Sequence, residues 1–123
     1  MGFAKKYKKK KFDIDTSNFE YNKLSELYEE NGKDALYHLC GVYINTKGNF
    51  GDSPVFATDF CFVNIPAHLL DTAREILNCE EDIQAINTGK VAFKIYQYTD
   101  QKHNRICYSV EFFDIDENGE IIE

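Results

Sequence analysis

Between Ala35 and Pro66, apolar and polar residues alternate with a period of two. β-Branched and aromatic residues are frequent in this stretch, and clusters of Gly, Asn and Asp separate the alternating runs. Such alternation is typical of half-buried strands, and the separating residues favour turns. The stretch therefore predicts three consecutive strands, one long and two short.

The long first strand carries Gly41 at its centre, where a missing side chain is typical of a bulge or a bend. A bent strand can belong to two sheets at once. If the strand is regular, every second side chain faces the core. A bulge at Gly41 would move the side chains beyond it to the opposite faces. The predicted core set is Leu36, His38, Cys40, Val42 and Ile44.

Helical spacing appears before and after these strands. Leu24 and Leu27 predict a short helix over Asn22–Asn31 that ends at Gly32. Pro66 fits the first position of a second helix, which has an apolar stripe along one face. The stripe consists of Leu69, Leu70, Ala73, Ile76 and Leu77.

A third helix is predicted directly after the second, with Asn78 as its N-cap and Glu80, Glu81 and Asp82 in its first turn. It is expected to end at Thr88-Gly89. Its apolar residues would add to the same core as the stripe of the second helix.

Two further alternating runs, Lys90–Thr99 and Arg105–Asp114, predict a fourth and a fifth strand. In the fifth, one set is expected to face inward (Ile106, Tyr108, Val110 and Phe112) and another outward (Ser109, Glu111 and Phe113). Five antiparallel strands with a helix between the third and fourth follow the order of the OB-fold. The predicted fold is therefore mainly β, in the α+β class: a five-stranded antiparallel OB-fold-like barrel with a short N-terminal helix.

The 123 residues provide for one domain, in which 43% of residues are hydrophobic and 28% are charged. No apolar run approaches the roughly 18 residues of a membrane span, and the N-terminus lacks the apolar segment of a secretory signal. We therefore expect no membrane partner and a cytoplasmic location. The four cysteines are widely spaced without a C-x-x-C pair, so we expect free thiols and neither a metal nor a cofactor.

The net charge of −7 conceals a strong asymmetry. Residues 5–11 hold six lysines, whereas residues 12–123 carry eight basic and twenty-one acidic side chains, a net charge of −13. We therefore divide the chain into a basic, flexible arm over residues 1–18 and a single domain over 19–123 with an acidic C-terminal end. The arm can neutralise phosphates without sequence preference. The alternative is a solvated tail that aids solubility or folds back on the acidic domain.

The fourth strand places Lys94, Tyr96 and Tyr98 on one side. A cation followed by two aromatic faces is the pattern with which single-strand binders hold phosphates and stack bases. An ordinary half-exposed sheet face is the alternative interpretation. The predicted neighbours of this row are the aromatic residues Tyr43 and Phe62, and the predicted loop residues around it are Lys47, Phe50, Lys102 and Arg105.

The runs GVYINTKGNFGDSPVFATD, FVNIPAHLL, KVAFKIYQYTD and YSVEFFDI span roughly residues 19–115. In these runs the chain resembles the small OB-fold single-stranded DNA-binding proteins of Gram-positive phages and conjugative plasmids. The resemblance implies an accessory protein of replication, recombination or conjugative transfer that coats single-stranded DNA, with RNA as the alternative. The chain departs from tight binders in having no Trp and a strongly acidic domain.

The sequence contains no nucleophile elbow, phosphate-cradling glycine loop or metal-binding His/Glu spacing, so we expect no catalytic residues and no enzyme activity. The alternative function is an acidic protein-interaction module that imitates nucleic acid and inhibits a host enzyme. A partly open barrel also leaves strand edges through which two copies could pair as a homo-oligomer.

Overall fold

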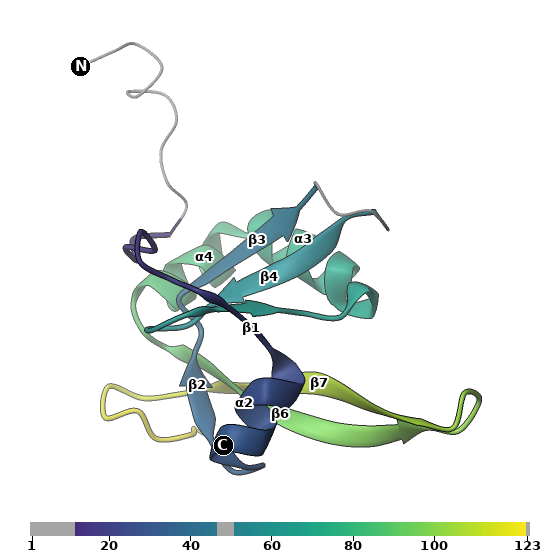
Figure 1. The fold of residues 1–123 in the computed structure, drawn as a ribbon. Coiled ribbons are helices and arrows are strands. Elements are labelled where there is room, and N and C mark those ends of the chain that lie inside the picture. Colours follow the sequence, from purple (N-terminus) through teal and green to yellow (C-terminus); the bar gives the residue numbers. More distant parts are fainter. Residues whose placement is uncertain (1–11, 47–50, 123) are drawn as a thin grey trace.

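The computed structural model describes residues 12–46 and 51–122. In these residues, seven strands form two sheets that pack face to face, and three α-helices accompany them (Figure 1). The mixed α+β class is thus confirmed. The two sheets of the described chain do not close into a barrel, because the third and fifth predicted strands, β5 (Phe62–Asn64) and β7 (Arg105–Asp114), do not pair with each other.

Sheet A has the strand order β1-β5-β4-β3, and sheet B has the order β2-β6-β7. The other five strands are β1 (Tyr21–Lys23), β2 (Leu36–His38), β3 (Gly41–Asn45), β4 (Ser53–Ala57) and β6 (Val91–Asp100). All neighbouring strands are antiparallel except β1 and β5, which run parallel.

The predicted long first strand is bent and belongs to both sheets, as β2 and β3. At the bend, the N–H of Leu39 donates to Val91 of sheet B and the N–H of Cys40 donates to Ala57 of sheet A. The bend reverses the side-chain phase, so Tyr37 and Leu39 are buried before it and Val42 after it. The predicted core set was therefore wrong for Leu36, His38 and Cys40, which are only half-buried. Ile44 has the phase of Val42 but is also only half-buried.

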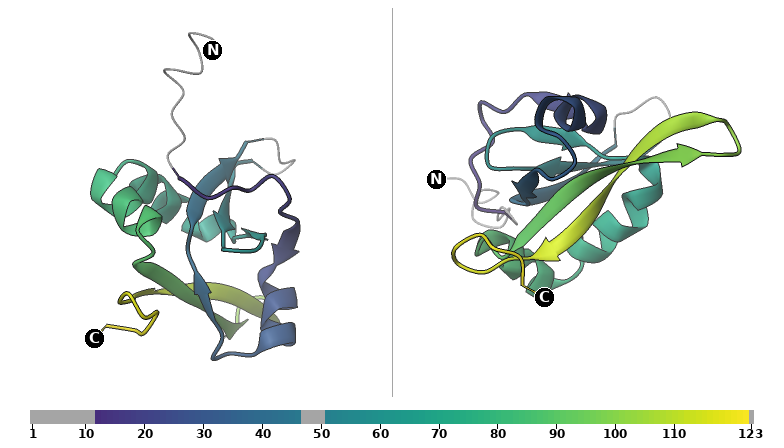
Figure 2. Two further views of the ribbon diagram at one scale, coloured as in Figure 1. Left: turned by 90° about the vertical axis from the view of Figure 1, so that its left-hand side faces the viewer. Right: turned by 90° about the horizontal axis from the view of Figure 1, so that it is seen from below.

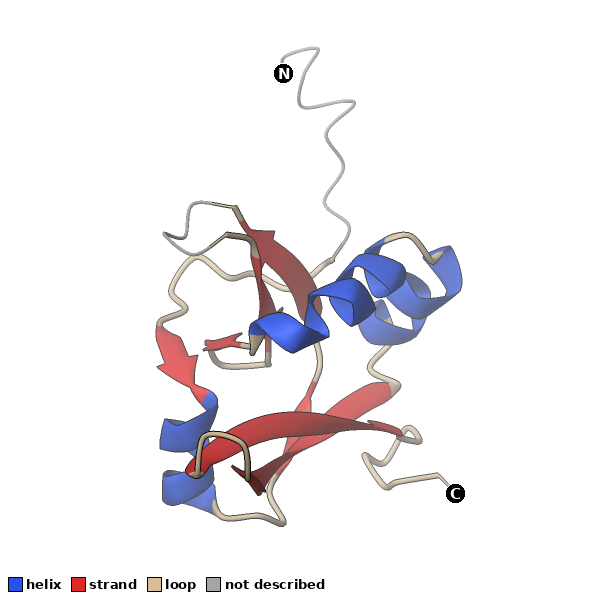
Figure 3. Ribbon diagram, turned by 90° about the vertical axis from the view of Figure 1, so that its right-hand side faces the viewer, coloured by secondary structure: helices blue, strands red, loops and turns tan. Residues whose placement is uncertain are grey.

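The core lies between the two sheets. Phe56 of β4 is fully buried, and its ring contacts both Phe93 of β6 and Phe112 of β7 at 5.7 Å. The helices α3 (Leu70–Leu77) and α4 (Glu80–Asn87) pack on each other beside sheet A, where Ala73 of α3 is buried (Figure 3).

The starts of these two helices differ from the predicted positions. A 3₁₀ turn over Ala67–Leu69 precedes α3, and Pro66 is the N-cap of this turn with extended backbone rather than its first helical residue. The N-cap of α4 is Cys79, not Asn78, because Asn78 is the C-cap of α3 and its backbone N–H donates to carbonyls of that helix. The acidic first turn of α4 is present as predicted.

The strand β1 was not predicted. It pairs with β5 so that Tyr21 lies opposite Phe62 and Lys23 lies opposite Asn64. The helix α2 (Leu24–Asn31) follows directly, starting two residues later than predicted, and ends at Gly32, where φ is +86°. Because α2 packs on β6 and β7, β1 and α2 together occupy the gap between β5 and β7.

The strands β6 and β7 form a long hairpin that projects from the body of the protein (Figure 2). Two predictions for β7 were wrong. Ile106, predicted to face inward, is 59% exposed because it lies in the projecting part. Ser109, predicted to face outward, is 2% exposed, and its Oγ lies 3.3 Å from Nε2 of His68.

Among the described residues, no helix is long and apolar enough to cross a bilayer.

Candidate nucleic-acid interface

The outer face of sheet A carries a small hollow walled by aromatic rings. The ring of Tyr21 stacks on that of Phe62 at a centroid distance of 4.9 Å, and Tyr43 meets Phe62 edge-on at 5.9 Å. Val55 forms the floor, and Asn45 and Thr46 form a polar rim. The volume is about 300 Å³. We call this feature, lined by Tyr21, Tyr43, Ile44, Asn45, Thr46, Val55 and Phe62, the aromatic hollow.

Strand register brings these rings together. Tyr21 and Phe62 are direct neighbours across β1 and β5, and paired residues of a sheet project from the same face. The ring of Tyr43 lies over Gly41, where an added Cβ would come within 2.9 Å of its Cε2 atom. Gly41 therefore makes room for one wall of the hollow. Burial, followed by the nearby Cys40, raises the pKa of Tyr43, so its hydroxyl remains neutral at physiological pH.

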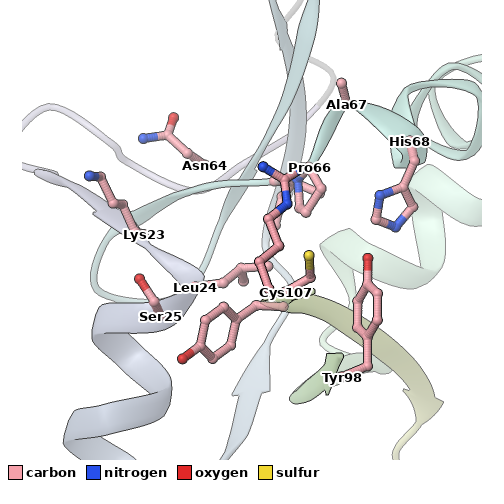
Figure 4. A pocket seen from close by; sticks show the side chains of 12 residues that line it. Lys23, Leu24, Ser25, Asn64, Pro66, Ala67, His68, Tyr98 and Cys107 are labelled. Carbon is pink, nitrogen blue, oxygen red and sulfur yellow. The ribbon is translucent and has the colours of Figure 1, made fainter. Parts of the chain in front are cut away.

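A larger groove of about 550 Å³ lies between α2, the chain after β5, and the projecting hairpin. Lys23, Ser25 and Asn64 lie on one side of this groove, and Tyr98 and His68 lie on the other (Figure 4). We call it the hairpin groove. Its full lining is Lys23, Leu24, Ser25, Asn64, Ile65, Pro66, Ala67, His68, Tyr98, Arg105, Cys107 and Tyr108.

The hollow and the groove are neighbours on the same face. Tyr21 and Phe62 wall the hollow, and the pair two positions further along the same strands, Lys23 and Asn64, lines the groove. Residues two apart in a strand share a face. The two features therefore form a continuous path of aromatic and polar side chains.

The charge along this path differs from that of the rest of the domain. Among the described residues that line the hollow and the groove there is no Asp or Glu, whereas the cations Lys23 and Arg105 are present. Residues 12–123 as a whole carry twenty-one acidic side chains. An apolar groove of about 300 Å³ lies between α3, α4 and sheet B. Unlike the hollow and the hairpin groove, it has acidic residues in its lining, namely Glu75, Asp82 and Asp114.

Asp100 lies near the groove at the end of β6 and moderates its positive charge. Its carboxylate is 2.9 Å from Nδ1 of His103 and 4.0 Å from Nε of Arg105. The hydrogen bond from His103 lowers the pKa of Asp100, with the backbone N–H of Lys102 acting in the same direction. Asp100 is therefore ionised at neutral pH and partly neutralises the hairpin turn.

The structure divides the sequence-predicted site residues into separate groups. Tyr43 and Phe62 line the aromatic hollow, and Tyr98 and Arg105 line the hairpin groove. Lys102 lies exposed in the hairpin turn. The others are Lys94 and Tyr96, which line neither feature, and Lys47 and Phe50, which lie outside the described residues.

The predicted row on β6 is a second aromatic surface, on the face of sheet B that also carries Ser109. The rings of Tyr96 and Tyr98 are 6.0 Å apart, and Nζ of Lys94 lies 5.4 Å from the ring centroid of Phe113. We call Lys94, Tyr96, Tyr98 and Phe113 the β6 row. Only Tyr98 belongs to both the β6 row and the hairpin groove.

Sequence reasoning missed Tyr21, Lys23, Asn64, His68 and Tyr108 as site residues. The alternation of Phe19, Tyr21 and Lys23 is a strand pattern that could have revealed the first two. It was overlooked because the neighbouring leucines have helical spacing.

The described residues contain no group of three or more His, Cys, Asp or Glu side chains that could hold a metal ion. All four cysteines are free thiols.

Comparison of the chain with protein-family models, with curated proteins and with solved structures gave no match.

Proposed function

We propose that this protein binds single-stranded nucleic acid, with DNA as the principal ligand, along the aromatic hollow and the hairpin groove. One observation carries the proposal: a path of exposed rings and cations without a carboxylate in its lining, on an otherwise acidic domain. Single-strand binders combine such stacking faces with cationic grooves.

The arrangement of the strands supports this proposal. We interpret the chain as an open variant of the OB-fold, in which β2 with β3, β4, β5, β6 and β7 correspond to strands one to five and α3 with α4 to the helical connection. OB-folds bind oligonucleotides on the face of strands two and three and between the loops that follow strands one and four. In this chain that face carries Val55, Phe62 and Asn64, and the second loop joins β6 to β7.

The aromatic and the cationic side chains have different roles in the proposed binding. Tyr21, Tyr43 and Phe62 provide ring faces and edges for bases, each stack contributing on the order of 1–3 kcal/mol. Lys23 and Arg105 provide charges for phosphates on the groove side. A protein of this kind would coat single strands as an accessory in replication, recombination or conjugative transfer.

The direct test is fluorescence anisotropy of a labelled single strand of about 30–40 bases and of its duplex, at about 50 and 200 mM salt. We expect tighter binding to the single strand. Tyr21→Ala should weaken it about 5- to 150-fold, since one stack is lost. Phe60→Ala removes a comparably exposed ring outside the path and should leave the affinity unchanged. Equal binding to single strand and duplex, or equal effects of the two variants, would refute the proposal.

The groove lined by Glu75, Asp82 and Asp114 supports a second candidate function, a protein-interaction module that binds a basic partner. The same experiment separates the two functions, because an acidic module would ignore nucleic acid in both forms.

A further inference from the structure

The groove between α3, α4 and sheet B has an apolar floor. The floor combines side chains from the bend between the sheets, both helices and both strands of the hairpin: Leu39, Ile76, Ile86, Val91 and Phe112. Leu39 and Ile86 are buried, whereas the other three are half-buried and keep part of their surface in contact with solvent. Covering such side chains removes apolar surface from water. The floor, in a groove of about 300 Å³, therefore favours an apolar side chain of a ligand.

Three carboxylates form the rim of this floor. Glu75 belongs to α3, Asp82 to α4 and Asp114 to the end of β7, and all three residues are exposed. The lining contains no Lys, Arg or His, and none of the residues that the structure describes forms an ion pair with these carboxylates. They are therefore available to cations of a ligand. We call the floor and its rim together the acidic groove.

The helices beside the acidic groove strengthen its negative charge. Residues 70–87 carry five acidic side chains and one basic side chain, Arg74. The guanidinium of Arg74 lies 3.2 Å from Asp52 and 3.9 Å from Asp71, so its charge is already compensated. A negative field of this kind attracts basic partners, accelerates their association and repels phosphates. The acidic groove is therefore suited to a cationic ligand and unsuited to nucleic acid.

The spread of the carboxylates indicates the kind of cation. Glu75, Asp82 and Asp114 come from three different elements, and the described residues contain no group of three or more His, Cys, Asp or Glu side chains that could hold a metal ion. Carboxylates that lie apart can instead pair with several separate charges, which the lysines and arginines of a protein segment provide. The apolar floor favours an apolar residue in the same segment.

We infer that the acidic groove docks a segment of a partner protein in which an apolar side chain is flanked by lysine or arginine. The apolar side chain occupies the floor as an anchor, and the cations pair with the three carboxylates of the rim. The inference rests on the acidic groove alone and specifies the segment that the second candidate function would bind. It is compatible with binding of nucleic acid, because none of the described residues lining the acidic groove also lines the aromatic hollow or the hairpin groove.

The test measures fluorescence anisotropy of a labelled peptide of about 15 residues, in which two leucines at i and i+4 are flanked by lysines. A second peptide has serine in place of both leucines. Both peptides are titrated with the full chain at about 50 and 200 mM salt, because salt screens exposed ion pairs.

Two variants of the full chain with equal net charge separate the acidic groove from the rest of the acidic surface. The groove variant combines Glu75→Gln, Asp82→Asn and Asp114→Asn. The control variant changes three exposed carboxylates outside the groove, by Glu29→Gln, Asp59→Asn and Glu111→Gln. Thermal denaturation verifies that both variants are folded.

At the lower salt concentration, the groove variant should bind the leucine peptide about 10- to 150-fold more weakly than the full chain, since three exposed ion pairs are lost. The control variant should stay within about threefold of the full chain, because charges distant from the peptide are screened. The full chain should bind the serine peptide at least about tenfold more weakly than the leucine peptide, because burial of an apolar anchor is lost.

Equal losses for the groove and control variants would refute the inference, because the peptide would then respond to overall charge alone. Equal affinity for the two peptides would refute it as well, since the floor would be unused. Sedimentation tests a second copy as the occupant: a dimer of the full chain that only the groove variant dissociates would overturn the assignment to a partner protein. Binding of the leucine peptide only after the lysines of residues 5–11 are replaced by Gln would assign the groove to the chain's own basic run.

Binding of the labelled single strand, measured on the same proteins, separates this inference from the proposed function. The groove variant should stay within about threefold of the full chain in single-strand affinity. Tyr21→Ala should leave the affinity for the leucine peptide unchanged, because Tyr21 does not line the acidic groove. A peptide result against the acidic groove thus leaves the proposed function standing, and failure of single-strand binding leaves the docking site standing.

Discussion

The aromatic hollow and the β6 row use similar residues to make different surfaces. The β6 row draws three of its four side chains from one strand, and its lysine lies over the ring of Phe113 in the same sheet. The hollow draws its rings from β1, β3 and β5, so that they surround a buried floor at Val55. Side chains from one strand form a row, whereas a concave surface requires side chains from several strands. We therefore propose that single strands bind the hollow and the hairpin groove rather than the β6 row.

The largest difference between the two surfaces is expected for Phe62→Ala and Phe113→Ala. Phe62 contacts three other rings, those of Phe19, Tyr21 and Tyr43. Its loss removes one stacking face and also the ring against which Tyr21 and Tyr43, two walls of the hollow, are packed. We expect a loss of about 2–4 kcal/mol in single-strand affinity. Both residues are half-buried, so thermal denaturation serves as the common control for folding. Equal losses of affinity in the two folded variants would contradict the assignment.

Tyr98 and Tyr96 provide a matched pair on one strand. They share a face and have similar exposure, but only Tyr98 lines the hairpin groove. Tyr98→Ala should reduce single-strand affinity by about 1–3 kcal/mol, the contribution of one stacked base. Tyr96→Ala should change it by less than the error of an anisotropy titration. A larger loss of affinity for Tyr96→Ala than for Tyr98→Ala would instead indicate that single strands bind the β6 row.

A smaller effect is expected for Gly41→Ala, which deletes no aromatic side chain. The added Cβ would lie 2.9 Å from the ring of Tyr43, and the ring has to turn away. We expect single-strand affinity to fall by about 1 kcal/mol because one wall of the hollow is displaced. Combining Gly41→Ala with Tyr43→Ala checks the cause, since the glycine substitution should have no further effect once the ring is absent.

The smallest effect is expected for the lysines of the two surfaces. Lys23→Gln should reduce the log–log salt slope of single-strand binding by about 0.7, the value for one phosphate contact. Lys94→Gln should leave the slope unchanged, because Lys94 lies over Phe113 and outside both the hollow and the groove. Titrations at several salt concentrations with one labelled oligonucleotide measure both slopes.

Local pattern was sufficient to predict much of the fold. The alternation after Ala35, the stripe of α3 and the two long runs of β6 and β7 each arise from contacts within one element and its immediate neighbours. Even the bend of the first strand was predicted, because Gly41 marks it in the sequence. The alternation gave a wrong prediction where the hairpin projects from the body. There Ile106 occupies a position predicted to face inward but is exposed.

The candidate site was harder to predict because it depends on register between distant segments. Tyr43 and Phe62 were identified by residue type, but Tyr21 joins them only through the parallel pairing of β1 with β5. Nothing in the local sequence of residues 19–23 indicates that partner. Likewise, Tyr98 and Tyr96 are equivalent in sequence pattern, and only the position of α2 and His68 around the hairpin separates them.

The parallel pairing of β1 with β5 also has a consequence for how the protein folds. The hairpin of β6 and β7 closes over residues 101–104 and can form early, whereas Tyr21 must find Phe62 across most of sheet A and the bend between the sheets. Contacts between segments distant in sequence carry a larger loop-closure cost and form more slowly. We therefore expect the hollow to form after that hairpin. Binding of a strand across β1 and β5 would hold the two ends of this long-range contact together and stabilise the folded protein.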